Sequence, residues 1–284
     1  MIHQARAQLP VRRLCSLLQV SRSGFYRRVP RSPAVVKPTE EAALVTTLRE
    51  VHAHSRRSYG TRRMCQALRV QGYPMGRVRM RTLMHQAGLT VVRRRRRPCT
   101  TESHHDLPIA PNHLNRQFSV AAPNRVWGSD ITYVATREGW LYLAIVVDLF
   151  SRKIVGWAVS ASLATPLVTA ALDMAIGQRR PAPGLLHHSD RGSQYASAVY
   201  QQRLQAQQMV SSMSGKGQCY DNAVVERVFR SVKEEGLSEG IPATRTQATA
   251  QVIDYITMFY NSQRLHSTLG YCSPNAFEAQ AQGT

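Results

Sequence analysis

Three carboxylates in the second half of the sequence stand where a metal-dependent reaction on phosphodiesters would need them. Asp130 lies in a run of strand-forming residues, Asp190 directly follows a short apolar strand, and Glu226 lies near the start of a helix after a glycine-containing loop. Carboxylate oxygens are the ligands that Mg²⁺ and Mn²⁺ prefer. Two such ions can activate the attacking oxygen and stabilise the leaving oxygen. We therefore expect these residues to be catalytic and to bind two ions.

Other polar residues nearby offer alternative ligands. Asp148 ends a strand and could be a fourth ligand, although capping the following turn is the more ordinary role there. Asp221 precedes Asn222 at a helix start, which favours a helix N-cap. His187 and His188 are neighbours in a strand, where successive side chains point to opposite faces, so at most one of them faces the site.

The elements that must position the carboxylates follow from the residue pattern. β-Branched and aromatic residues predict three consecutive antiparallel strands over 127–134, 140–148 and 153–159. Helical and strand patterns then alternate over 166–177 (helix), 185–188 (strand), 196–207 (helix), 209–213 (strand) and 223–235 (helix). This order predicts the α/β fold class, as an RNase H-like domain.

The charge of the chain is concentrated in its first half. Of the 284 residues, 37 are Lys or Arg and 17 are Asp or Glu, which gives a net charge of +20. Residues 1–120 hold 23 basic and 5 acidic residues, and residues 121–284 hold 14 and 12. Such an excess predicts a polyanionic partner, and nucleic acid is the first candidate.

A helix-turn-helix pattern lies within this basic half, between Thr61 and Gly88, with Gly72 at the turn. A recognition helix presents the residues near its start to the major groove of DNA. The second helix carries three arginines there, namely Arg77, Arg79 and Arg81. The alternative is that these arginines form a solvated face of a small helical bundle.

Five consecutive arginines follow the helix-turn-helix: Arg93, Arg94, Arg95, Arg96 and Arg97. Adjacent cations repel one another unless phosphates neutralise them, so this run predicts phosphate binding. The prolines after it indicate an extended tether. The sequence thus divides into a small helical unit (1–36), a helix-turn-helix DNA-binding region (37–97), a basic, proline-containing linker (98–120) and an RNase H-like catalytic core with C-terminal helices (121–284).

Several short motifs resemble the OrfB transposases of the IS-three (IS3) family of bacterial insertion sequences, whose catalytic core is related to retroviral integrases. They are residues 59–63 (Tyr-Gly-Thr-Arg-Arg), 127–133 (Trp-Gly-Ser-Asp-Ile-Thr-Tyr), 188–195 (His-Ser-Asp-Arg-Gly-Ser-Gln-Tyr), 220–223 (Tyr-Asp-Asn-Ala) and 259–261 (Phe-Tyr-Asn) with Arg264, His266, Ser267, residues 269–271 (Leu-Gly-Tyr), Ser273 and Pro274. The family's Asp-Asp-Glu triad falls on Asp130, Asp190 and Glu226, with the family spacing of 35 residues between the last two.

The resemblance implies a DNA transposase subunit that cleaves and transfers DNA strands with Mg²⁺ or Mn²⁺. Lys233 matches the basic residue that follows the family's glutamate, and a DNA-phosphate contact is its implied role. The partners implied are DNA, the upstream product OrfA as a fusion or separate protein, and further copies of this chain in a synaptic complex. Ser193 and Tyr195 could contact DNA or complete a turn.

Two other functions stay open at this point, a DNA-binding regulator with an inactive catalytic domain and a nuclease that only hydrolyses. No apolar run is long enough to span a membrane, and the sequence start lacks the apolar stretch of a signal peptide. We therefore expect a cytoplasmic, nucleoid-associated protein. The five scattered cysteines form neither a disulfide framework nor a zinc module.

Overall fold

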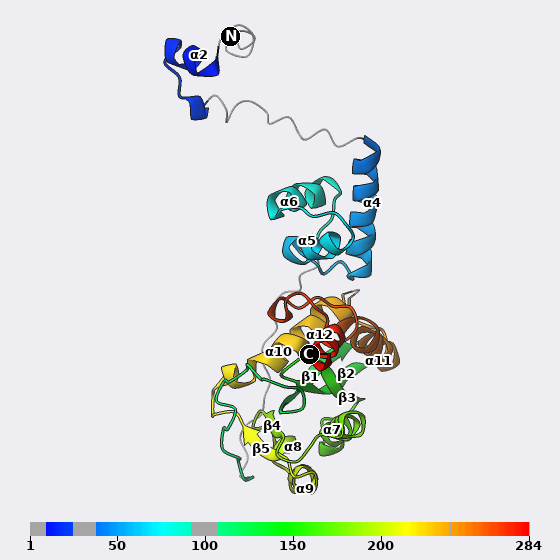
Figure 1. The fold of residues 1–284 in the computed structure, drawn as a ribbon. Helices are drawn as coiled ribbons and strands as arrows, with labels where there is room; N and C mark the ends of the chain where they lie inside the picture. The colour runs from blue at the N-terminus through cyan, green and yellow to red at the C-terminus, as the bar shows by residue number, and fades with distance from the viewer. Residues whose placement is uncertain (1–9, 25–37, 92–106, 239, 284) are drawn as a thin grey trace. The chain divides into compact units, whose positions relative to one another are not determined.

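The structure is a computed structural model, drawn in Figure 1, that describes residues 10–24, 38–91, 107–238 and 240–283. The chain divides into two compact units, Met1–Thr46 and Thr47–Thr284. In the first unit, helix α2 (Val11–Leu17) buries Leu14 and Cys15. Within the described ranges, no helix is long and apolar enough to span a bilayer.

The predicted helix-turn-helix is present. Helix α4 (Pro38–His54) precedes it, and helices α5 (Thr61–Val70) and α6 (Arg77–Gln86) form the motif itself. The apolar residues of α5 and α6 recur at helical spacing and are buried: Met64, Cys65, Leu68, Met80, Leu83 and Met84. Gly72, between the two helices, has a φ of +87°, a conformation that glycine adopts without steric cost.

The predicted catalytic core, residues 121–284 (the catalytic unit), is built on a five-stranded sheet in the order β3-β2-β1-β4-β5. Its strands are β1 (Val126–Thr136), β2 (Gly139–Asp148), β3 (Ile154–Ser160), β4 (Leu186–Ser189) and β5 (Val210–Met213). The first three strands pair antiparallel, whereas β4 pairs parallel to both β1 and β5. The predicted mixed α/β, RNase H-like fold is confirmed, and β1 lies at the centre of the sheet.

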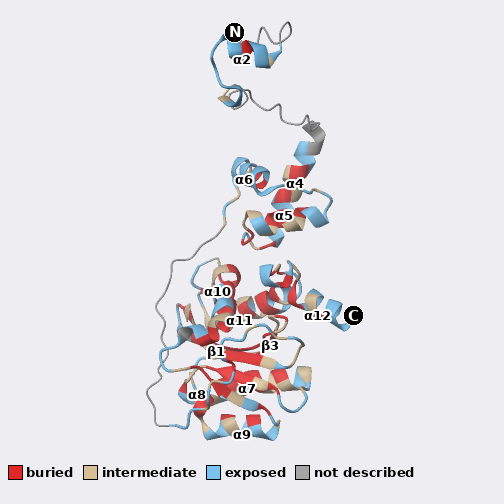
Figure 2. Cartoon of the chain, turned by 60° about the vertical axis from the view of Figure 1, so that its left-hand side comes forward, coloured by how far each residue is buried: buried red, intermediate tan, exposed pale blue. Residues whose placement is uncertain are grey.

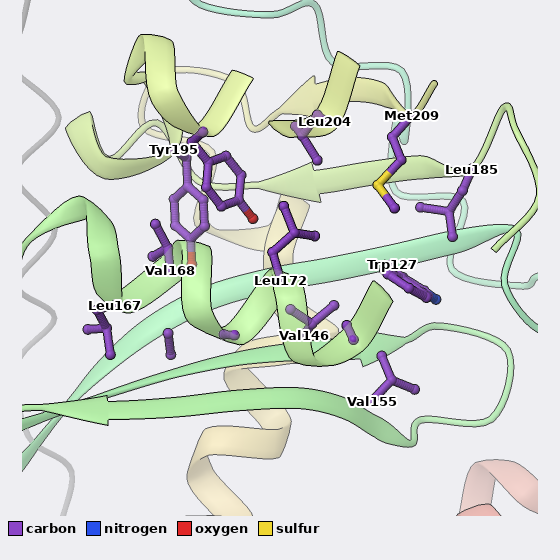
Figure 3. Close-up of a cluster of buried hydrophobic side chains, with 14 of the residues drawn as sticks. Trp127, Val146, Val155, Leu167, Val168, Leu172, Leu185, Tyr195, Leu204 and Met209 are labelled. Atoms are coloured by element: carbon purple, nitrogen blue, oxygen red, sulfur yellow. The ribbon is translucent and has the colours of Figure 1, made fainter. Parts of the chain in front are cut away.

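Helices cover both faces of this sheet. Helices α7 (Thr165–Arg179), α8 (Ser193–Ala196) and α9 (Ala198–Ala206) lie on one face, where buried apolar side chains form the main core. Figure 2 shows α10 and α11 on the other side of the sheet. Figure 3 shows Trp127 and Val146 of the sheet facing Val168 and Leu172 of α7.

The helices on the second face are α10 (Ala223–Ser231), α11 (Arg245–Asp254) and α12 (Pro274–Gln282). Short helical turns connect them: a 3₁₀ turn, η1 (Cys219–Asn222), two π-helical segments, η2 (Val232–Gly236) and η3 (Tyr255–Tyr260), and a 3₁₀ turn, η4 (Ser267–Leu269). The helix predicted over 223–235 therefore changes to π-helical geometry after Ser231.

Residues 107–120 pack on the catalytic unit, so the expectation of an extended tether is wrong for this part of the linker. Leu114 is buried. The backbone amides of His113 and Leu114 donate to Ser212 Oγ at 2.9 and 3.3 Å. Because β5 is an edge strand, one of its sides is free to bind this segment.

Candidate active site

Asp130 lies in the middle of the central strand, on the face that α10 covers. Side chains alternate along a strand, so Asp130 shares its face with Gly128. A Cβ atom at Gly128 would lie 2.7 Å from Val225 Cγ2 on α10, so the glycine allows this helix to approach β1 closely. The backbone amide of Ile131 donates to Asp130 Oδ1 at 2.7 Å and orients the half-buried carboxylate.

Asp190 directly follows β4, which runs parallel to β1. The two strands pair Gly128 with His188, and each aspartate lies two residues beyond its member of that pair. The pairing thus directs both carboxylates to the same region. Asp190 Oδ1 accepts a hydrogen bond from the Gly192 amide at 2.9 Å, which holds the turn after the strand.

Glu226 is exposed in the first turn of α10. The start of this helix is fixed to β1, because Asn222 Nδ2 donates to the carbonyl of Ser129, next to Asp130, at 3.1 Å. Although Glu226 as a whole is exposed, partial desolvation of its carboxylate raises its pKa. Burial also raises the pKa of Asp130 well above its ordinary value, and the negative charges of Asp190 and Glu226 raise it further.

Lys233 opposes the increase in the pKa of Asp130. It lies in η2, after the α-helical part of α10 has ended, and its positive charge lowers the pKa of Asp130. The structure thus brings the predicted basic residue close enough to Asp130 for their charges to interact. The site contains three acids and one base from β1, the end of β4, and the α10–η2 segment.

The carboxylates suit a hard divalent cation by their chemistry, since oxygen ligands and negative charge are what such an ion requires. Asp130 and Asp190 fit best, because both are half-buried and oriented by backbone amides. In the described parts of the chain, however, no three His, Cys, Asp or Glu side chains are arranged so that together they could hold a metal ion. Glu226 is the member that stays exposed.

Asp148 has the structural role that its position suggested. Its fully buried carboxylate accepts hydrogen bonds from the amides of Asn124 and Phe150 at 2.7 and 2.9 Å, and it pairs with Arg179 at 3.3 Å. Arg179 also binds Glu278 at 2.8 Å. Asp148 therefore holds the turn after β2 and the end of α7.

Asp221 does not cap α10, contrary to expectation. Asn222 occupies the N-cap position and makes no side-chain capping bond. Asp221 instead accepts hydrogen bonds from the Gly215 amide at 2.9 Å, Asn112 Nδ2 at 2.9 Å and Arg116 Nε at 2.7 Å. Donors from two other segments outcompete the local cap, and Asp221 fastens the glycine-containing loop to residues 112–116.

The two histidines point to opposite faces of β4, as predicted. His187 Nε2 lies 2.8 Å from Ser129 Oγ and 3.1 Å from Tyr200 Oη, whereas His188 lies 2.9 Å from Ser212 Oγ and 3.2 Å from Ser214 Oγ. Burial lowers the pKa of His187 to about 3 and that of His188 to about 4. Both are therefore neutral hydrogen-bonding groups of the core.

Ser193 and Tyr195, for which the sequence allows both a DNA contact and a role in the turn, differ in their exposure. Ser193 is exposed at the start of α8, whereas Tyr195 is 1% exposed and packs against Tyr200. Its hydroxyl has no hydrogen-bond partner in the described parts of the chain. Burial excludes direct DNA contact by Tyr195 and leaves Ser193 accessible.

The candidate DNA-binding arginines of α6 are accessible. Arg77, Arg79 and Arg81 are all exposed, and none of them forms an ion pair with another described residue. The sequence from 51 to 91 contains eight arginines and no acidic residue. The five further arginines predicted to bind phosphate, Arg93, Arg94, Arg95, Arg96 and Arg97, lie outside the described residues.

Sequence reasoning missed a buried ion pair next to the site. Glu235, two residues after Lys233, accepts hydrogen bonds from Arg264 Nε at 2.7 Å and Nη2 at 2.8 Å. The signal for it was present, because Arg264 belongs to one of the C-terminal motifs. Asn261, three residues before Arg264, binds the start of β3. Its side chain accepts a hydrogen bond from the Ile154 amide at 3.0 Å and donates one to the Ile154 carbonyl at 2.9 Å.

Comparison with known families gives matches over most of the chain. Residues 120–219 and 207–274 match the integrase core domain family, and residues 39–97 match the HTH-like domain family. The catalytic core domain of HTLV-2 integrase, solved in complex with magnesium, is 15% identical, with a TM-score of 0.45. The match covers 55% of this chain and 97% of that domain.

Two curated relatives resemble the chain over nearly its whole length. It is 42% identical to the 31 kDa protein of insertion element IS600 from Shigella sonnei, over 93% of this chain and 97% of that protein. It is 36% identical to the transposase InsF of insertion sequence IS3A from Escherichia coli K12, over 98% of this chain and 96% of the transposase. The chain therefore belongs to the IS3 family of insertion-sequence transposases, with an HTH-like region followed by an integrase catalytic core.

Proposed function

We propose that this transposase cleaves and joins DNA strands with two divalent ions, Mg²⁺ or Mn²⁺, held by Asp130, Asp190 and Glu226. The observation that carries the proposal is the parallel pairing of β1 with β4, which places Asp130 and Asp190 each two residues beyond the paired Gly128 and His188. In support of it, the negative charges of Asp190 and Glu226 raise the pKa of Asp130. A cation between them would remove that repulsion. Two bound ions would supply activation of the attacking oxygen and stabilisation of the leaving oxygen.

The residues have different tasks in this proposal. Asp130 and Asp190 form the fixed part of the site, because backbone amides already orient their carboxylates. Glu226 is exposed on α10 and completes the site by turning its side chain toward the pair. Lys233 carries a positive charge beside Asp130 and binds a phosphate of the DNA strand that lies across the site.

The proposed reaction has two steps. Water attacks a phosphodiester at the end of the element, the bond to the 3′ oxygen breaks, and a free 3′-OH remains. That 3′-OH then attacks a phosphodiester of a second DNA segment, so that a new P–O bond forms and the 3′ oxygen of the attacked strand leaves. No protein atom becomes covalently attached to DNA.

The basic first half holds the DNA. The exposed positions of Arg77, Arg79 and Arg81 near the start of α6 support a contact with the major groove and its phosphates. Arg93, Arg94, Arg95, Arg96 and Arg97 would add sequence-independent phosphate contacts. We retain the division into residues 1–36, 37–97, 98–120 and 121–284 as the functional organisation.

OrfA, as a fusion or a separate protein, would help to recognise the ends of the element. Two ends must meet during transposition, so several copies of this chain would assemble on DNA in the cytoplasm, at the nucleoid.

A strand-transfer assay tests the proposal. The full chain, with and without OrfA, is given Mg²⁺ and a pre-cut element end with a free 3′-OH, and we expect a joined product. Cleavage of uncut ends without any joining of pre-cut ends would identify a nuclease. DNA binding with neither cleavage nor joining would identify a regulator. Either result would overturn the proposal.

A further inference from the structure

A buried ionic cluster connects the helix-turn-helix to the segment that carries Lys233. Glu235 lies at its centre and is bound at both carboxylate oxygens by Arg264. The hydroxyl of Tyr255 donates to Glu235 Oε2 at 2.8 Å. The third partner comes from α5, where Arg63 Nη1 lies 3.3 Å from Glu235 Oε1. One carboxylate thus joins α5, η2, η3 and the chain near residue 264.

The cluster fixes the π-helical turn that presents Lys233 to the active site. Burial disfavours the charged form of Glu235, but its hydrogen bonds and ion pair with Arg264 prevail and lower its pKa. Gly236 packs so closely on Tyr255 that a Cβ atom there would lie 2.8 Å from the ring. Within η2, Glu235 is therefore anchored inside the protein while the charge of Lys233 acts on Asp130.

The segment just before α5 strengthens the same contact. The backbone amide of Leu265 donates to Tyr59 Oη at 2.7 Å, and the guanidinium of Arg63 stacks over the Tyr59 ring at 4.8 Å. Arg56 lies over the ring of Tyr255 at 5.5 Å and forms an ion pair with Asp254. The start of the helix-turn-helix is thereby held against residues 254–265.

Arg63 is not needed to compensate the buried charge. Arg264 alone satisfies both oxygens of Glu235 in the bidentate geometry that gives strong ion pairs. The Arg63 side chain is 25% exposed, and its contact with Glu235 is longer. Removing Arg63 therefore leaves no unpaired buried charge, which is the change that usually destabilises a protein strongly. What Arg63 contributes is a contact between α5 and η2.

We propose that Arg63 is a positioning residue, which couples DNA binding by the helix-turn-helix to the placement of Lys233 beside Asp130. DNA held by α6 acts through Arg63 and Glu235 on η2, so that Lys233 meets the phosphate only when the helix-turn-helix is correctly seated. This inference rests on the proposed strand-transfer function, because it assigns a cause to the rate of that reaction.

The test compares two neighbouring charge removals on α5. Arg63→Gln removes the contact with Glu235, and Arg62→Gln removes an exposed charge from the same helix. We expect both variants to bind element-end DNA with similar affinity and to melt at similar temperatures. At saturating DNA, only Arg63→Gln loses strand-transfer rate, by about tenfold, as expected for a coupling of typical size. Arg63→Lys recovers most of this loss.

Hydrogen exchange supplies a second measurement that does not need catalysis. Amides of residues 232–237 should exchange faster in DNA-bound Arg63→Gln than in DNA-bound Arg62→Gln. Equal strand-transfer rates and equal amide exchange in the two variants would overturn the inference. A lower melting temperature of Arg63→Gln alone would also overturn it, because Arg63 would then be a structural residue. If the wild-type chain joins no DNA, the proposed function fails, and the exchange comparison still decides this inference.

Discussion

Asp130 lies in β1 and Asp190 directly follows β4, and the negative charge of Asp190 raises the pKa of Asp130. Parallel pairing of β1 with β4 causes this arrangement, because each aspartate lies two residues beyond the paired Gly128 and His188. A protein that places two carboxylates together loses stability when both ionise. A bound cation would remove this loss of stability, so the loss favours cation binding. It can be measured by protein stability alone, without an assay of activity.

The first prediction concerns the metal-free protein at neutral pH. Between the ordinary pKa of an aspartate and the raised pKa of Asp130, the native state binds more protons than the unfolded state. The free energy of unfolding therefore falls as pH rises through this range. Asp130→Asn removes this effect. We expect the variant to melt about 2–4 °C higher than the wild type without metal, which corresponds to about 1 kcal/mol.

Addition of Mg²⁺ should reverse this order. The ion stabilises the wild-type chain by binding only the native state, whereas Asp130→Asn responds weakly because it lacks one ligand. Differential scanning fluorimetry at pH 7.5, with and without Mg²⁺, measures both effects. A variant that melts lower than the wild type in EDTA and gains as much from Mg²⁺ would contradict the assignment.

The second prediction separates Asp148 from the metal site. Asp148→Asn weakens its bonds to the Asn124 and Phe150 amides and its ion pair with Arg179. Hydrogen bonds to charged groups are typically worth more than neutral ones, so we expect a loss of about 2–3 kcal/mol in urea denaturation. The stabilisation by Mg²⁺ should stay as large as in the wild type. A lost Mg²⁺ response would make Asp148 a ligand.

The third prediction concerns the arginines of α6. If Arg77, Arg79 and Arg81 each contact one phosphate, replacing all three with Gln should reduce the slope of log affinity against log salt by about 2.7. Arg137→Gln, at an exposed position in the turn after β1, is the control and should leave the slope unchanged. Fluorescence anisotropy with labelled element-end DNA at several salt concentrations gives the slopes. Equal slopes for the triple variant and the wild type would assign these arginines to a solvated face.

The fourth prediction is an acid sensitivity of the core. The pKa of buried His187 is lowered to about 3 and that of His188 to about 4, so the unfolded state binds more protons below pH 6.5. Stability is therefore lost as pH falls from 6.5 toward 4, by about 1.4 kcal/mol per pH unit for each histidine. Urea denaturation of wild type and His188→Gln should show a smaller slope with pH in the variant. Parallel pH curves would mean that His188 does not titrate with unfolding.

Much of the fold could be predicted from local sequence because its elements have strong patterns. The apolar, β-branched run from 140 to 148 lies within β2, whose residues from Leu143 to Asp148 are all buried. Helical spacing of Met64 and Leu68 likewise identified α5. The three site carboxylates could be named because few acidic residues occur in this half and their motifs are distinctive.

The rest depends on contacts between residues far apart in the chain. Asp221 accepts hydrogen bonds from Asn112 and Arg116, about a hundred residues earlier, so no local rule could find its role. The same holds for Glu235, whose partner Arg264 comes from a later segment. The change from α to π geometry after Ser231 occurs in the segment that holds Glu235, and helix propensity alone does not show it.

Metal-dependent strand transfer by Asp130, Asp190 and Glu226 can be tested by removing the charge of one of these carboxylates. Asp190→Asn and the control Asp173→Asn, at an aspartate that pairs with Arg203 on the surface, are compared in Mg²⁺ with a pre-cut element end. We predict that Asp190→Asn binds the DNA with wild-type affinity and forms no joined product, while Asp173→Asn joins strands at the wild-type rate. Joined product from Asp190→Asn at the wild-type rate would show that strand transfer does not depend on this carboxylate.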